Sequence, residues 1–148
     1  MEIGVYNAVS AESMIKSAIE NNPANQIEYY GFDFFQNYST EQIGQKLGAL
    51  GCQYKLIKGN TMNTVLEAAN TLPLMDIIFI DGGKSYQEAS TDWKGSSKLM
   101  HDRTGLFVHN VDFRGVGRML DEVPRDKYHV ETFYPRSEGM VALIKLSS

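Results

Sequence analysis

The sequence is poor in cysteine and has no long apolar run. Its single cysteine, Cys52, cannot form an intramolecular disulfide, which agrees with a reducing compartment. No apolar stretch approaches membrane-spanning length, and the N-terminus lacks a basic segment followed by an apolar one. We therefore expect a soluble, cytoplasmic protein with no membrane partner.

An excess of basic residues is also absent. The chain has 14 Lys and Arg residues against 18 Asp and Glu residues, which gives a formal net charge of -4. No Lys/Arg cluster of the kind that follows a phosphate backbone is present, so we expect no nucleic-acid partner. The 148 residues, 43% of them hydrophobic, suffice for one domain with a sizeable core and are too few for two. A single domain is expected over 1–148.

Short apolar runs alternate with segments of helical period along most of the chain. This alternation is typical of repeated β-α units and a parallel sheet. Strands are expected over 1–5, 27–32, 54–57, 75–80 and 105–109. Helices are expected over 11–19 with Asn7 or Ser10 as N-cap, from Ser39 or Thr40 to Gly51, over 62–69 before Pro73, from Tyr86 through Met100, and over 117–123.

The last part of the chain departs from this alternation. Two apolar segments, 128–134 and 140–146, are separated by only the five residues 135–139. Because this connection leaves no room for a helix, the two segments are expected to pair as an antiparallel hairpin. The pattern therefore predicts five β-α units closed by a hairpin.

The fourth expected strand, MDIIFI over 75–80, ends abruptly in Asp81-Gly82-Gly83-Lys84. Its lack of polar alternation predicts a central strand covered on both faces. Ligands of open parallel sheets bind at the carboxyl ends of the strands. Polar or acidic residues follow all five strands, within 4–10, at Asp33, within 59–61, within 81–84 and within 109–112. Each alone suits a turn, but together they favour a ligand site.

These strand ends and the closing hairpin resemble a known family. The segments that carry the resemblance are EIGVYNAVSA from Glu2, GFD ending at Asp33, KGN ending at Asn60, and IFIDG ending at Gly82. They are similar to S-adenosylmethionine-dependent methyltransferases of the Rossmann-like class, closest to the small-molecule O-methyltransferase branch. The resemblance implies a three-layer α/β/α sandwich whose seven-stranded sheet is mostly parallel, with the last strand antiparallel.

The same resemblance implies a set of cofactor contacts. Gly4 and the loop with Tyr6, Asn7 and Ser10 would border the methionine part of S-adenosylmethionine, and Glu2 would support that loop. Asp33 would accept hydrogen bonds from the ribose hydroxyls.

Further contacts are implied at the adenine and at the sulfonium. Phe34 or Phe35 would flank the adenine, and Gly59, Asn60 and Thr61 would lie beside it, with Asn60 replacing an acid of the family. Asp81 would lie near the sulfonium.

Two devices for deprotonating a hydroxyl are compatible with the sequence. In metal-dependent relatives, Asp81, His109 and Asn110 would correspond to ligands of a divalent cation such as Mg2+ or Mn2+, with Lys84 as base. His109 in place of Asp suits Mn2+, Fe2+ or Zn2+ better than Mg2+. Alternatively, His109 is itself the general base and no metal takes part. The sequence leaves both open.

The leading hypothesis is an enzyme that methylates a hydroxyl of a small molecule. A non-catalytic module that binds S-adenosylmethionine is the first alternative, favoured by Ala8, Asn60 and Asn110. A NAD-type Rossmann oxidoreductase is disfavoured, because the glycine fingerprint of dinucleotide-binding loops is absent. The family's N-terminal cap helices are expected to be missing, which leaves either a chain that starts late or an open pocket. Such a pocket could borrow a lid from a second subunit, so a homodimer is a further hypothesis.

Overall fold

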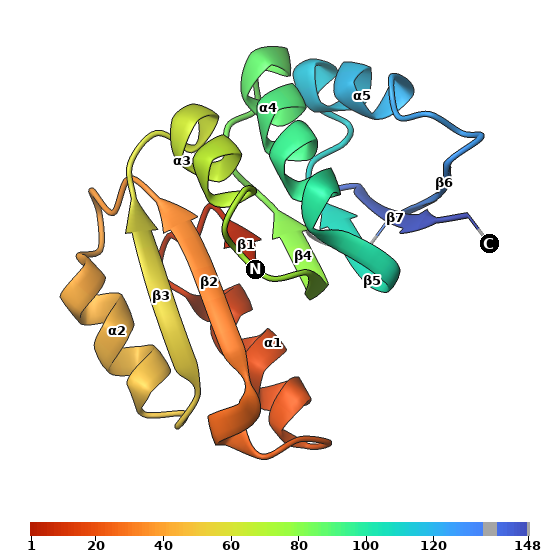
Figure 1. Ribbon diagram of the computed structural model, residues 1–148. Coiled ribbons are helices and arrows are strands. Elements are labelled where there is room, and N and C mark those ends of the chain that lie inside the picture. Colours follow the sequence, from red (N-terminus) through yellow and green to blue (C-terminus); the bar gives the residue numbers. More distant parts are fainter. Residues whose placement is uncertain (135–138, 148) are drawn as a thin grey trace.

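The computed structural model describes residues 1–134 and 139–147, and there it contains one seven-stranded sheet. Figure 1 shows the strands in the order β3-β2-β1-β4-β5-β7-β6. Their bounds are β1 (Glu2–Ile3), β2 (Glu28–Asp33), β3 (Gln53–Lys58), β4 (Met75–Ile80), β5 (Met100–Val108), β6 (Tyr128–Phe133) and β7 (Val141–Leu146). The pairs among β1 to β5 are parallel, and β7 is antiparallel to both β5 and β6. This confirms the predicted mostly parallel sheet. Of the predicted connection 135–139, only Gly139 lies within the described residues.

Helices cover both faces of the sheet. They are α1 (Val9–Ile19), α2 (Thr40–Gly48), α3 (Thr61–Ala68), α4 (Tyr86–Ser96) and α5 (Arg114–Asp121), with short 3-10 turns η1 (Ala24–Gln26) and η2 (Ser97–Leu99). α3, α4 and α5 gather on one face, and α1 and α2 lie on the other (Figure 1). Each face has its own hydrophobic cluster, one around Ile78 and Leu106 and one around Ile43 and Leu47. The three-layer architecture is therefore confirmed.

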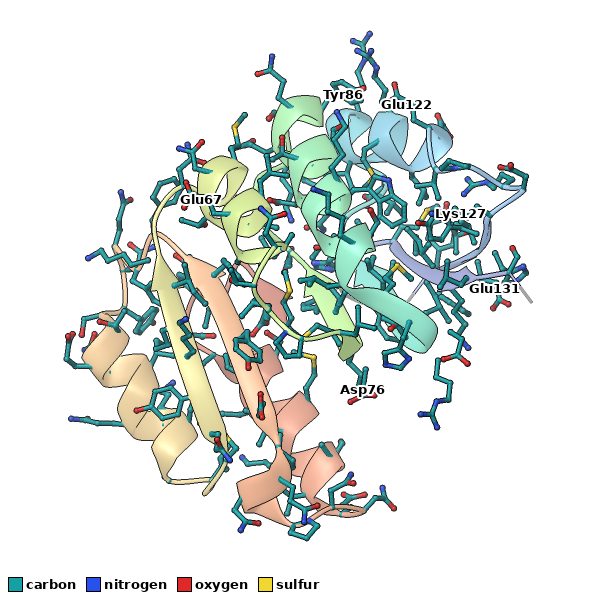
Figure 2. All side chains as sticks on the ribbon, in the orientation of Figure 1. Glu67, Asp76, Tyr86, Glu122, Lys127 and Glu131 are labelled. Atoms are coloured by element: carbon teal, nitrogen blue, oxygen red, sulfur yellow. The ribbon has the colours of Figure 1, made fainter. Side chains whose placement is uncertain are left out.

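Capping residues set the starts of two helices. Ser39 and Gln42 form a capping box at α2, and Ser85 and Glu88 form one at α4. At the same end of α4, the hydroxyl of Tyr86 donates at 2.5 Å to Glu122, the C-cap residue of α5, and Figure 2 shows these two side chains close together. The α4 and α5 layer is thus tied together beside the loop that precedes α4.

The predicted N-cap of α1 is wrong. Ala8, in the left-handed region at φ 64°, occupies the N-cap position and offers no side-chain acceptor. Asn7 instead accepts from the amide of Val9 at 3.2 Å. Ser10 lies inside the helix because its hydroxyl is used by the buried carboxylate of Glu2.

Two boundaries after β4 also differ from the prediction. Met100 is the first residue of β5 and not part of the preceding helix, because the chain leaves α4 at Ser96 through η2. α5 begins at Arg114, three residues earlier than expected, and its first turn closes through a 2.8 Å hydrogen bond from the amide of Gly117 to the carbonyl of Phe113.

β4 is central, as predicted, but it is not covered on both faces along its length. Ile78 and Ile80 are buried, whereas Ile77 is 43% exposed. Asp76 points away from the sheet (Figure 2). A wide groove of about 1000 Å³ borders Met75–Ile77 and α1, so the face of the strand that carries Ile77 is open. Within the described residues, no helix is long and apolar enough to cross a bilayer.

Candidate functional site

The order of the strands reverses between β1 and β4, which is where ligands of open α/β sheets bind. The two strand ends pack closely here. The amide of Asp81 donates to the carbonyl of Ile3 at 2.8 Å, and Gly4 has φ 87°. A Cβ on Gly4 would overlap the carbonyl oxygen of Asp81, so only glycine allows this approach.

A buried carboxylate supports the first loop. Glu2 is 0% exposed and accepts hydrogen bonds from the hydroxyls of Ser10 and Tyr29. Burial raises the pKa of Glu2, although both hydrogen bonds act in the opposite direction. Burial and the neighbouring Glu2 raise the pKa of the Tyr29 hydroxyl. The structure therefore brings Glu2 and Ser10 together, as the supporting role requires, and adds Tyr29, which sequence reasoning missed.

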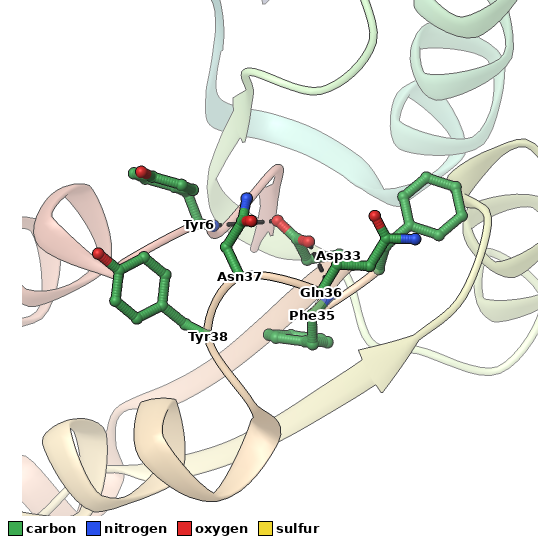
Figure 3. Close-up of a pocket in the computed structure, with 7 residues that line it drawn as sticks. Tyr6, Asp33, Phe35, Gln36, Asn37 and Tyr38 are labelled. Carbon is green, nitrogen blue, oxygen red and sulfur yellow. Dashed lines mark hydrogen bonds between the residues drawn. The ribbon is translucent and has the colours of Figure 1, made fainter.

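Asp33 links the loop after β1 to the loop after β2. Its Oδ2 accepts from the amide of Tyr6 at 3.0 Å and its Oδ1 accepts from the amide of Phe35 at 2.8 Å (Figure 3). The two loops enclose a small pocket of about 190 Å³, which is lined by Tyr6, Asp33, Phe34, Phe35, Gln36, Asn37 and Tyr38. Phe34 is 46% exposed. A carboxylate and an accessible aromatic ring thus lie at the position expected to receive a nucleoside.

Asn60 and Thr61 lie at the start of α3. The side chain of Asn60 is the N-cap of this helix and accepts from the amide of Met62 at 3.0 Å. Gly59, with φ 150°, makes the turn before it. Capping accounts for the presence of Asn60 without a ligand, so its contact with adenine stays a prediction.

The loops after β4 and β5 bring Asp81, Lys84 and His109 together. The ammonium of Lys84 donates to Asp81 Oδ1 at 2.5 Å, and His109 Nδ1 lies 3.0 Å from the same oxygen. Each of the three side chains is less than one third exposed. Gly115 of α5 permits this arrangement, because a Cβ there would overlap the carbonyl oxygen of Lys84.

The predicted metal ligands do not fit a divalent cation in this arrangement. Among the described side chains, no group of three or more His, Cys, Asp or Glu could hold a metal ion. The Lys84 ammonium contacts Asp81 Oδ1, where it would repel a cation. Asn110, at φ 56°, turns its amide nitrogen to within 2.7 Å of where a Cβ on Gly139 would lie. One carboxylate and one imidazole are a poor donor set for Mg2+.

One buried carboxylate near the site escaped the sequence reasoning. Asp92 of α4 is 0% exposed, and Gly82 lies directly against it. A signal was present, because Asp92 follows Ala89 by three residues and precedes Trp93, and both of these neighbours lie on the buried face of α4. A charged residue on an apolar helix face is uncommon without a partner.

Comparisons with known proteins agree with this geometry. A family model described as a methyltransferase domain matches residues 1–111. No curated protein matches the chain.

Solved structures of methyltransferases have the same fold. CalS11, a TDP-rhamnose 3'-O-methyltransferase of calicheamicin biosynthesis, is 15% identical with a TM-score of 0.81, covering 100% of this chain and 71% of that one. An O-methyltransferase from Bacillus cereus in complex with SAH is 13% identical, covering 99% and 72%, with a TM-score of 0.80. TomG from Streptomyces achromogenes, in complex with SAM, is 13% identical, covering 99% and 72%, with a TM-score of 0.76. With three quarters of its length matched by the family model, the chain belongs to the methyltransferase domain family.

Proposed function

We propose that this protein transfers a methyl group from S-adenosylmethionine to a hydroxyl oxygen of a small molecule, with His109 as the general base. The observation that carries the proposal is the shared carboxylate oxygen of Asp81, which lies 3.0 Å from His109 Nδ1 and 2.5 Å from the Lys84 ammonium. A methyltransferase domain whose strand ends carry this group has both a cofactor site and a candidate base.

The loops after β1, β2 and β3 have the donors and acceptors that the cofactor requires. When bound, S-adenosylmethionine supplies a methyl group already activated by its sulfonium. Asp33 would accept hydrogen bonds from the ribose hydroxyls. Each of its carboxylate oxygens accepts only one hydrogen bond from a backbone amide, so each has a lone pair left for a hydroxyl. Phe34 would cover one face of the adenine, with Gly59, Asn60 and Thr61 beside it. Tyr6 and Asn7 would border the methionine part of the cofactor. They belong to the loop that the hydrogen bond between Ser10 and Glu2 supports.

His109 would remove the proton from the acceptor hydroxyl. In the proposed mechanism, the imidazole of His109, whose Nδ1 lies 3.0 Å from Asp81 Oδ1, accepts the proton of the hydroxyl. Lys84 holds the carboxylate in place through a hydrogen bond to the same oxygen. Asp81 and Lys84 are therefore positioning residues for the base, and no step is assigned to a divalent cation.

The acceptor is proposed to be a small molecule because solved O-methyltransferases that act on small molecules have the same fold. CalS11 is a TDP-rhamnose 3'-O-methyltransferase, and a sugar hydroxyl is therefore one proposed acceptor for this protein. A cytoplasmic location, supported by the single and buried Cys52, and a homodimer that covers the site belong to the same proposal.

Calorimetric titration with S-adenosylmethionine, S-adenosylhomocysteine and NAD, in EDTA and in Mn2+, tests the cofactor. We expect binding of both sulfur nucleotides, no binding of NAD, and no effect of Mn2+. If the protein binds neither sulfur nucleotide, the proposal is refuted. A strong gain in affinity with Mn2+ would support the hypothesis that a divalent cation takes part.

Transfer of an isotope-labelled methyl group to a panel of phenols and sugar nucleotides tests catalysis. His109→Gln should slow transfer by about 10²- to 10⁴-fold and retain binding. Binding without transfer to any acceptor would favour the second candidate, a non-catalytic module. The use of Asn60 as a helix cap, in place of an adenine-binding acid, is the observation that keeps this candidate open.

A further inference from the structure

The carboxylate of Asp92 is buried without compensation. Its side chain is 0% exposed, and neither oxygen has a hydrogen-bond partner among the described residues. The hydroxyl of Thr61 on α3 faces it and lowers its pKa, but the geometry falls short of a hydrogen bond. Burial dominates and raises the pKa of Asp92 to about 7. Burying a carboxylate without hydrogen bonds costs free energy, so Asp92 needs an explanation other than the stability of the fold.

Asp92 lies directly under the point where the strand order reverses. Its Oδ2 is 2.9 Å from where a Cβ on Gly82 would be, and a methyl carbon of Ile3 is 3.1 Å from the same point. Gly82 follows Asp81 at the end of β4, and Ile3 is the last residue of β1. A ligand over the carboxyl ends of these two strands is therefore separated from the Asp92 carboxylate by little more than the Gly82 backbone.

Charged groups of the protein do not neutralise Asp92. Glu88, one turn earlier on α4, raises its pKa, and Lys84, in the loop before α4, lowers it by less. The ammonium of Lys84 is already paired with Asp81 at 2.5 Å. Gly82 and Ile3, which lie near the carboxylate on the side of the sheet, carry no charge. A charge in such surroundings acts over a longer distance than it does in water.

We infer that Asp92 is a buried counter-charge for the cationic cofactor and makes the site prefer S-adenosylmethionine over S-adenosylhomocysteine. The inference rests on the proposed function. The two nucleotides differ at sulfur by one methyl group and one positive charge, so a nearby buried anion stabilises the sulfonium and does little for the neutral thioether. Asp92 does not touch the cofactor. It acts through its field across Gly82, and the site favours the reactant over the product.

Calorimetry with Asp92→Asn tests this inference. The amide has the shape of the carboxylate without its charge, so the dissociation constant for S-adenosylmethionine should rise about tenfold. The constant for S-adenosylhomocysteine should change less than about threefold. Asp121→Asn, an exposed carboxylate on α5, is the matched control and should change neither constant. A Kd ratio for the two nucleotides that Asp92→Asn leaves unchanged would overturn the inference.

The wild-type protein gives an independent measurement if the variant folds poorly. Between pH 6 and pH 8, ionisation of Asp92 should improve S-adenosylmethionine binding relative to S-adenosylhomocysteine by about fivefold. A ratio that is flat over this range would overturn the inference. If the wild-type protein binds neither nucleotide, the proposed function fails. If it binds both and the ratio of their dissociation constants does not change with pH, only the role of Asp92 fails.

Discussion

His109 Nδ1 lies 3.0 Å from Asp81 Oδ1, although the two residues are far apart in the sequence. Strand register explains the approach. Ile80 of β4 is paired with Val108 of β5 in parallel, so the next residue of each strand reaches the same edge of the sheet. Lys84 then reaches back from the start of the following loop to the same carboxylate oxygen. The group is therefore built on the two central strands, where backbone pairing holds it.

Replacing His109 by Gln should remove the base and leave the cofactor site intact. The expected result is a fall of about 10²- to 10⁴-fold in the rate of methyl transfer. The dissociation constant for S-adenosylmethionine should stay within about threefold. Single-turnover kinetics with saturating cofactor would measure the first quantity, and calorimetry the second.

His129→Gln is the control for this substitution, because His129 is exposed on β6 and contacts only Glu131 among the interactions described for it. Transfer by this variant should match the wild type, as should wild-type transfer in EDTA. A His109→Gln enzyme with normal transfer would show that another group takes the proton.

Regular strand ends made much of the site predictable. An apolar strand followed by an acid can be recognised in the sequence, and parallel pairing brings such strand ends to one edge of the sheet. Asp33, Asp81 and His109 lie at that edge as expected, and their roles stay predictions. The mostly parallel sheet with an antiparallel last strand followed from the family resemblance and the short connection of the hairpin, whereas the order of the strands was not predicted.

Features that depend on tertiary contacts were less predictable. Ala8 is the N-cap of α1, and Ser10 lies inside the helix with its hydroxyl bonded to Glu2, a contact that no local pattern contains. Exposure of Ile77 could not be read from an apolar run, since coverage depends on which helices pack on each face. Burial of Asp92 could not be predicted from the apolar spacing of α4, because that spacing identifies the buried face through Ala89 and Trp93 and does not show whether a polar residue between them is covered.

Asp33→Ala should weaken binding of S-adenosylmethionine by on the order of 1.5 to 3 kcal/mol, through loss of charge-assisted hydrogen bonds to the ribose. Part of the loss comes from the loops, since the amides of Tyr6 and Phe35 lose their acceptor. Calorimetry would measure the affinity, with Asp126→Ala, an exposed carboxylate, as control. Unchanged affinity would mean that Asp33 does not contact the ribose.

Gly4→Ala should destabilise the protein by about 3 kcal/mol, because the backbone is left-handed at φ 87° and the new Cβ overlaps the carbonyl oxygen of Asp81. Gly48→Ala is a matched control on α2. Its new Cβ would lie 3.8 Å from the ring of Tyr54, which is ordinary contact, so it should stabilise the helix by up to about 1 kcal/mol. Urea denaturation would give both free energies of unfolding. Equal effects of the two substitutions would contradict the close approach of β1 and β4.

Tyr29→Phe should cost about 1 to 3 kcal/mol of unfolding free energy, because the buried Glu2 loses one of its two hydrogen-bond donors. The neighbouring Tyr30→Phe removes only an exposed hydrogen bond to Glu28 and should cost less than about 0.5 kcal/mol. Chemical denaturation of the two variants at one pH would compare them directly. A Tyr29→Phe protein as stable as the wild type would show that Ser10 alone satisfies Glu2.

Asp92→Asn should change stability in a pH-dependent way. The folded protein raises the pKa of Asp92 from 3.8 to about 7, so between these values the unfolded chain ionises while the folded one stays protonated. The wild type therefore loses stability as pH rises from about 4 to about 7, by roughly 4 kcal/mol at most, and the loss is constant above that. Asn does not titrate, so the variant should overtake the wild type across this window.

Urea midpoints of both proteins from pH 4 to pH 8 would give the difference curve, with Asp121→Asn as the exposed control. Glu2 also titrates with a raised pKa, but it is common to both proteins and cancels in the difference. A difference that is flat with pH would mean that Asp92 is already ionised and compensated in the folded protein. An Asp92→Asn protein that is more stable at pH 8 and yet binds S-adenosylmethionine more weakly would show that Asp92 serves binding and not packing. Lost packing would weaken stability and binding together.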